Sequence, residues 1–125
     1  MPSKPARISD AELQLLQLLW DKSPLGATEL ADRLPEGRDW TLATVKTLLS
    51  RLLAKGAVAA DQDGRRYSYR PLIDRESVAT HQARGLIDRL FGGRVSPLVA
   101  QLAEQQELTD QDLAELEALV RSLRK

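Results

Sequence analysis

The Asp63-Gly64 dipeptide constrains the fold of this 125-residue chain more than any other feature. It stands between two short segments with extended character, 57–60 and 65–70, and closes the predicted turn 61–64. Asp-Gly is favoured in tight hairpin turns because glycine tolerates the backbone angles that they need. Tyr67 and Tyr69 alternate with polar residues, which is typical of a two-faced strand. The chain is therefore predicted to contain a β-hairpin at this point.

Three helical segments precede this hairpin. Ser9-Asp10-Ala11-Glu12 is a capping box that starts a helix ending near Lys22, before Ser23-Pro24. A second helix is expected at 27–34, and a third from the N-cap Thr41 to about Lys55. Three helices followed by a hairpin is the order of a winged helix-turn-helix domain. We assign this domain to residues 1–72 and the fold class to mainly α with a small β-hairpin wing.

The third helix has a face suited to DNA. Its predicted buried stripe is Val45, Leu48, Leu49, Leu52 and Leu53, and no acidic residue occurs from Thr41 to Gly56. A helix that reads the major groove must present small polar and basic side chains on its outer face. The hairpin tip would add cations along the flanking phosphates. The predicted DNA-binding residues are Thr41, Thr44, Lys46, Thr47, Ser50, Arg51, Arg65 and Arg66.

Residues 73–125 are predicted to form a helical dimerisation region. Asp74 caps a long helix that ends at Gly92-Gly93, a short helix follows Ser96-Pro97, and Thr109 caps the last helix. Apolar residues recur at helical spacing, and no sheet is predicted to cover them, so a second copy of the chain is the economical partner. The predicted interface residues are Ala83, Leu86, Ile87, Leu90, Phe91, Leu98, Leu102, Leu113, Leu116 and Val120.

The charge balance limits how the chain could hold DNA. The 18 Lys and Arg residues match 18 Asp and Glu residues, so the formal net charge is zero. This balance argues against binding that rests on bulk positive charge. Residues 38–70, however, carry seven basic and three acidic side chains. A few cations are thus concentrated in the segment that would face DNA.

Composition also limits the catalytic and metal sites that the chain could form. The chain has no cysteine and a single histidine, His81, which removes thiol nucleophiles and disfavours a zinc site or a Cys/His catalytic centre. No glycine-rich phosphate loop occurs. We therefore expect no enzymatic activity and no cofactor. Apolar runs are too short for a membrane span, and the first seven residues lack a signal-peptide core, so a cytoplasmic protein without membrane insertion is expected.

Two ordered motifs carry a family resemblance. They are Trp40-x-x-x-Thr44-Val45-Lys46-Thr47-Leu48-Leu49-x-Arg51-Leu52 and Gly64-Arg65-x-Tyr67-x-Tyr69. With the flanking residues, they resemble the penicillinase repressor (BlaI/MecI/CopY) family. The resemblance implies a homodimeric winged-helix repressor whose recognition helices read an inverted repeat in operator DNA. It gives the recognition role to Thr44, Lys46, Thr47 and Arg51.

The chain departs from the family pattern at three places. Ala43 stands where many members carry lysine, and the cysteine pairs of the copper-responsive branch are missing. The stretch Val99-Ala100-Gln101-Leu102 lacks the Asn-Phe bond that is cleaved in the β-lactam-responsive branch. Thiolate copper sensing and cleavage at that bond are therefore not expected. A membrane-anchored sensor protease with another preference stays open as a partner.

Two other functions fit the same residues. The first is a winged-helix protein–protein adaptor, in which the polar face of the third helix would bind an acidic partner. The second is a ligand-sensing winged-helix regulator. The acid-free face together with Arg65 and Arg66 favours DNA over a protein partner.

Overall fold

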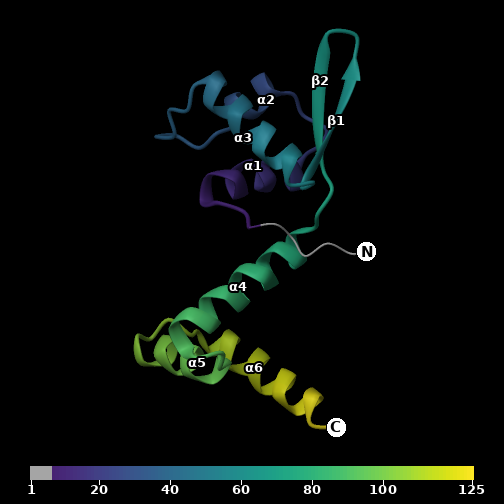
Figure 1. Ribbon diagram of the computed structural model, residues 1–125. Coiled ribbons are helices and arrows are strands. Elements are labelled where there is room, and N and C mark those ends of the chain that lie inside the picture. Colours follow the sequence, from purple (N-terminus) through teal and green to yellow (C-terminus); the bar gives the residue numbers. More distant parts are fainter. Residues whose placement is uncertain (1–6) are drawn as a thin grey trace. The chain divides into compact units, whose positions relative to one another are not determined.

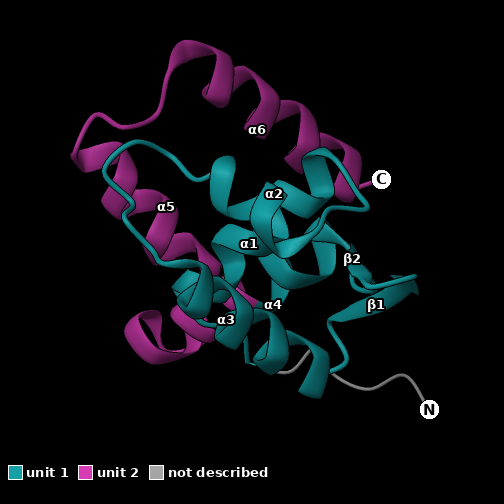
Figure 2. Cartoon of the chain, turned by 90° about the horizontal axis from the view of Figure 1, so that it is seen from above, with its two compact units in different colours: residues 1–81 teal, residues 82–125 magenta. Residues whose placement is uncertain are grey.

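The computed structural model describes residues 7–125 and is mainly helical with one hairpin (Figure 1). Contacts divide it into two compact units at His81 and Gln82, within the fourth helix (Figure 2). The elements, in chain order, are α1 (Asp10–Asp21), α2 (Ala27–Asp32), α3 (Leu42–Ala54), β1 (Val58–Asp63), β2 (Arg66–Pro71), α4 (Arg75–Phe91), α5 (Val95–Glu104) and α6 (Asp110–Leu123).

The first unit has a core built from one stripe of each helix. Apolar residues three or four positions apart lie on one helix face, and packing these faces together removes them from water. The start of α4 also belongs to this core, because Val78 is buried in it. The buried apolar residues are Ile8, Leu15, Leu16, Leu19, Leu25, Leu30, Val45, Leu48, Leu49, Leu52, Ala57, Val58 and Val78.

Most helix ends follow the predicted caps, with corrections at α2 and α5 and for one side chain of α3. Ser9 and Glu12 form the capping box of α1, and Thr41 accepts a hydrogen bond from the N–H of Thr44. Helix α2 ends at Asp32 rather than residue 34, because proline at 35 disfavours helical backbone at the residue before it. Helix α5 begins at Val95 rather than after Ser96-Pro97, because proline is tolerated in the first turn of a helix. Leu53, predicted to be buried, is 38% exposed because it lies at the edge of the α3 stripe, one residue beyond Leu52.

The predicted hairpin is present, but its turn is shorter than expected. Strand β1 continues to Asp63, which pairs with Arg66, so the central residues of the turn are Gly64 and Arg65. Gly64 has a φ of +65°, a conformation that suits glycine. The expected turn 61–64 was wrong because cross-strand pairing extended through polar residues that carry no strand signal of their own.

A third chain segment is hydrogen-bonded to the hairpin and connects it to the helices. Leu25, just before α2, pairs with Tyr69 in an antiparallel bridge. The Leu25 N–H donates to the Tyr69 carbonyl at 3.1 Å, and the Tyr69 N–H donates to the Leu25 carbonyl at 2.8 Å. The hairpin is therefore held beside the start of α2.

The second unit comprises the rest of α4 with α5 and α6. Thr109 and Asp112 form a capping box at the start of α6, and Gly92 and Gly93, both with positive φ, follow the last residue of α4. Ile87 is buried. Many large apolar side chains of this unit stay exposed, namely Leu86, Leu90, Val95, Leu102, Leu113, Leu119, Val120 and Leu123.

Within residues 7–125, no helix combines the length and the apolar character that crossing a membrane requires.

Candidate nucleic-acid interface

The exposed face of α3 carries all six predicted helix residues of the site. Thr41, Thr44, Lys46, Thr47, Ser50 and Arg51 are exposed, while the opposite face is buried through Val45, Leu49 and Leu52. The core therefore fixes the orientation of α3 and leaves one polar face outside. No carboxylate lies on this helix.

Three threonine hydroxyls on this face make hydrogen bonds within the helix or at its N-cap. The Thr41 Oγ1 accepts from the Thr44 N–H at 3.1 Å and lies 3.1 Å from the Thr44 Oγ1. The Thr47 hydroxyl donates to the Ala43 carbonyl at 3.0 Å. In contrast, no hydrogen bond or ion pair within residues 7–125 engages the side chain of Lys46 or Arg51. These two cations are available to a ligand.

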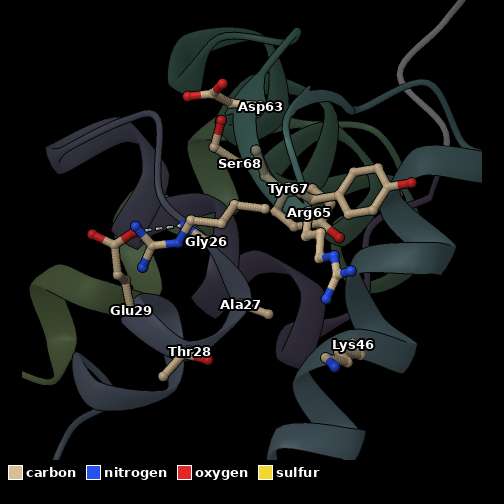
Figure 3. A pocket seen from close by; sticks show the side chains of 11 residues that line it. Gly26, Ala27, Thr28, Glu29, Lys46, Asp63, Arg65, Tyr67 and Ser68 are labelled. Atoms are coloured by element: carbon tan, nitrogen blue, oxygen red, sulfur yellow. Dashed lines mark hydrogen bonds between the residues drawn. The ribbon is translucent and has the colours of Figure 1, made fainter.

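A groove lies between α3, the start of α2 and the hairpin (Figure 3). Its volume is about 390 Å³. It brings Lys46 of α3 together with Arg65 and Arg66 of the hairpin, as the sequence predicted for one surface, whereas the other predicted α3 residues do not line it. The lining residues are Gly26, Ala27, Thr28, Glu29, Lys46, Asp63, Arg65, Arg66, Tyr67, Ser68 and Tyr69.

Three cations and two carboxylates line this groove. Glu29 is engaged locally, since its Oε1 accepts from the Gly26 N–H at 3.1 Å in the capping box of α2. The side chains of Arg65 and Arg66 make no hydrogen bond or ion pair within the described part of the chain. The groove therefore carries unpaired positive charge.

The hairpin packs closely against the start of α2 on one side of the groove. A Cβ atom added to Gly26 would lie 3.2 Å from the Tyr67 carbonyl oxygen and 3.4 Å from the Glu29 Oε1. Glycine at this position allows the hairpin backbone to approach α2. Sequence reasoning missed Gly26, Thr28 and Tyr67 as groove residues, although the alternation of Tyr67 with Tyr69 was a signal for the tyrosine.

A partly buried ion pair fixes the other end of α3, since the Glu12 side chain is buried and the Lys55 side chain is 29% exposed. The Lys55 Nζ lies 2.6 Å from the Glu12 Oε1 and donates to the Arg7 carbonyl at 2.6 Å. Burial by itself would raise the pKa of Glu12, but hydrogen bonds from Lys55 and Ser9 outweigh it and lower that pKa. Glu12 is therefore ionised in the folded protein and connects the start of α1 to the C-cap of α3.

Comparisons with known proteins agree with this fold. The family model described as penicillinase repressor matches residues 8–122. The penicillinase repressor of Bacillus licheniformis is 29% identical over 90% of this chain and 88% of its own length. The methicillin resistance regulatory protein MecI of Staphylococcus aureus is 25% identical over 93% of this chain and 94% of its own length.

Solved structures of the repressor BlaI also match this chain. The DNA-binding domain of the repressor BlaI is 35% identical, with a TM-score of 0.52 over 62% of this chain and 93% of that domain. The monomeric form of Bacillus licheniformis BlaI in complex with the blaP half-operator is 35% identical, with a TM-score of 0.51 over 59% of this chain and 90% of that one. These matches confirm the predicted winged-helix fold, and with the family model they establish that the chain belongs to the penicillinase repressor family.

Proposed function

We propose that the chain is a sequence-specific DNA-binding transcriptional repressor that acts as a homodimer on a pseudo-palindromic operator. The observation that carries the proposal is the acid-free, exposed face of α3, with Lys46 and Arg51 unpaired beside a hairpin that carries Arg65 and Arg66. The related BlaI monomer was solved with a half-operator, which supports DNA as the partner of this surface.

The geometry of α3 suits the major groove, which is wide enough for one α-helix. Buried Leu49 and Leu52 anchor the helix from behind, so its outer face can be inserted without disturbing the core. Arg51 can form two hydrogen bonds to the edge of a guanine, which would supply specificity. Thr44 and Thr47 are short enough for the helix backbone to approach the DNA, and their hydroxyls can bond phosphate or base by rotating away from the hydrogen bonds that they make within the helix.

The C-terminal unit supplies a reason for a dimer. Leu90, Leu113 and Val120 are 66%, 46% and 49% exposed, and such large apolar side chains lose contact with water when a second copy covers them. A two-fold dimer would carry two recognition helices and read two half-sites related by the same symmetry. This arrangement explains why a repressor of this size would carry a helical unit after its DNA-binding unit.

A selection experiment tests DNA recognition. The wild-type chain is incubated with a pool of random duplexes, bound duplexes are recovered, and their shared sequence is measured again by mobility shift. We expect an inverted repeat. We expect Arg51→Ala to lose about 1–3 kcal/mol of specific binding free energy, because a bidentate guanine contact is removed.

Arg94→Ala is the matched control, since it removes the same charge at an exposed position outside α3 and the hairpin. It should bind the selected duplex nearly as well as the wild type. Equal affinities for Arg51→Ala and the wild type would reject α3 as the recognition helix. A wild-type chain that binds no duplex at low salt would reject the repressor and favour the adaptor.

A further inference from the structure

Tyr67 and Tyr69 share one face of β2 but lie in different surroundings. Side chains two residues apart in a strand point to the same side of the sheet. Tyr69 is half-buried and packs against the core, whereas Tyr67 is 52% exposed. The core-facing side of the hairpin therefore continues beyond the core, and there Tyr67 lines the groove.

The Tyr67 side chain has unused binding capacity. None of the hydrogen bonds within residues 7–125 involves its hydroxyl. Lys46, Arg65 and Arg66 line the same groove, and Figure 3 labels Lys46 and Arg65 together with Tyr67. Glu29 and Asp63 also line the groove, and the Oε1 of Glu29 is already occupied by the Gly26 N–H. A phenol among unpaired cations suits a ligand that has both anionic and apolar parts.

A DNA strand has this composition, because each nucleotide joins a charged phosphate to an apolar deoxyribose face. Tyrosine hydroxyls are among the groups that contact phosphate oxygens in protein–DNA complexes. A tyrosine ring can at the same time pack against the sugar. A free anion would use the cations but would leave the ring exposed.

We infer that Tyr67 is a DNA-backbone contact, whose hydroxyl donates to a phosphate oxygen and whose ring packs on the adjacent deoxyribose of the strand bound between the hairpin and α3. This inference rests on the proposed function and adds a residue to it. The contact is independent of base sequence, so it sets the position of the hairpin on the duplex rather than the choice of operator.

Two variants separate the two parts of the contact. Tyr67→Phe removes only the hydroxyl and should weaken binding about 3- to 10-fold, as expected for one lost hydrogen bond. Tyr67→Ala removes the ring as well and should weaken binding further. Both losses should be equal for a selected duplex and for a random duplex, because backbone contacts are shared by all sequences.

The salt dependence distinguishes Tyr67 from its charged neighbours. Tyrosine displaces no counterion, so both Tyr67 variants should keep the wild-type slope of log affinity against log salt concentration. Arg65→Ala, in contrast, should lower the slope by about 1. Gln62→Ala is the control for the hairpin itself, because Gln62 is the cross-strand partner of Tyr67 and does not line the groove.

The outcomes separate this inference from the proposed function. Unchanged affinity of both Tyr67 variants, in a wild-type background that binds duplex DNA and depends on Arg51, would overturn the role of Tyr67 alone. An equal loss in Gln62→Ala would also overturn it, since the effect would then come from the hairpin fold. A wild-type chain without duplex binding would reject the proposed function instead.

Discussion

Glu12 is the only charged side chain that is buried among residues 7–125, and it connects two helices far apart in sequence. A buried carboxylate must be compensated, or it would take up a proton. Here the Lys55 ammonium and the capping interactions with Ser9 compensate it, and the pKa of Glu12 is lowered in the folded state. The capping box could be predicted from the residue types at Ser9 and Glu12. The pairing of Glu12 with Lys55 could not, because it depends on how α1 packs against α3.

The lowered pKa of Glu12 predicts acid-sensitive stability. A carboxyl group whose folded pKa lies below its unfolded value stabilises the fold above the unfolded pKa and loses this contribution as the pH falls through the folded pKa. Glu12→Gln keeps a capping amide but removes the charge. We expect it to lower the free energy of unfolding by about 1–3 kcal/mol at neutral pH, because Lys55 loses its charged partner.

Urea denaturation over a pH series checks this expectation. The difference between wild type and Glu12→Gln should shrink as the pH falls below the ordinary carboxyl pKa. Asp10→Asn is the matched control, because Asp10 lies in the same first turn of α1 but is exposed. A stability difference that stays constant down to acid pH would contradict the role assigned to the Glu12 charge.

At the scale of elements, the hairpin depends on contacts that local sequence does not encode. The helices were predictable from their apolar stripes, and α1, α3 and α6 also from their caps: Ser9, Thr41 and Thr109 all occupy the predicted N-cap positions. The hairpin was predictable from Gly64, but the length of β1 was not. Pairing between the strands and the bridge from Leu25 to Tyr69 decide where the strands end and where the groove opens.

Local sequence encodes only part of the candidate site. The exposed cations of α3 and the hairpin follow from periodicity, since they are the residues left outside the apolar stripes. The groove, in contrast, is formed by segments joined in three dimensions, and the α2 residues in it, such as Gly26 and Thr28, carry no local signal for a site. Whether the predicted residues contact DNA stays a prediction.

Gly26 offers a test of the packing between α2 and the hairpin. Its φ is −83°, so alanine meets no backbone strain there, and any effect comes from the new Cβ contact with the Tyr67 carbonyl at 3.2 Å. We expect Gly26→Ala to destabilise the fold by about 1 kcal/mol, because the hairpin must shift and alanine is a poorer N-cap than glycine. Duplex binding should weaken as the groove wall moves.

Gly85→Ala is the matched control, with the same chemical change inside α4. The added Cβ would meet only the end of the flexible Arg89 side chain, at 3.3 Å. Alanine is favoured over glycine within a helix by about 0.5–1 kcal/mol, so this variant should be more stable than the wild type. Thermal unfolding of both variants gives the signs. Stabilisation by Gly26→Ala would show that the Tyr67 carbonyl does not restrict the space for a Cβ atom at residue 26.

At the scale of the whole molecule, the two units have different surfaces. In the first unit the large apolar side chains are mostly buried, and the predicted DNA-binding residues are polar and exposed. In the second unit, α6 carries a shallow, mainly apolar hollow lined by Leu113, Leu116 and Val120 together with Glu117, Arg121 and Arg124. Net neutrality of the chain is therefore compatible with a function in which one surface binds an anion and another binds an apolar partner.

The proposed dimer predicts that charges on this α6 face separate the subunits. In Leu116→Asp/Val120→Asp, association would bury two carboxylates per subunit among apolar side chains, at a cost of several kcal/mol that the neighbouring Arg121 and Arg124 would offset only in part. We expect this double variant to be a monomer in sedimentation equilibrium at concentrations where the wild type is a dimer. Its affinity for a full inverted repeat should fall toward that for a single half-site, because the two recognition helices are no longer linked.

Ala118→Asp/Ser122→Asp is the matched control for this prediction. It adds the same two charges to α6, but on the helix face opposite the one that carries Leu116 and Val120. Because these positions lie outside the proposed interface, the control should stay dimeric and bind the full repeat like the wild type. Dimers of the Leu116→Asp/Val120→Asp variant would remove this α6 face from the interface. Monomers of both variants would instead point to a general effect of acidic charge on the helix, since only a face-specific loss follows from burial of the apolar hollow.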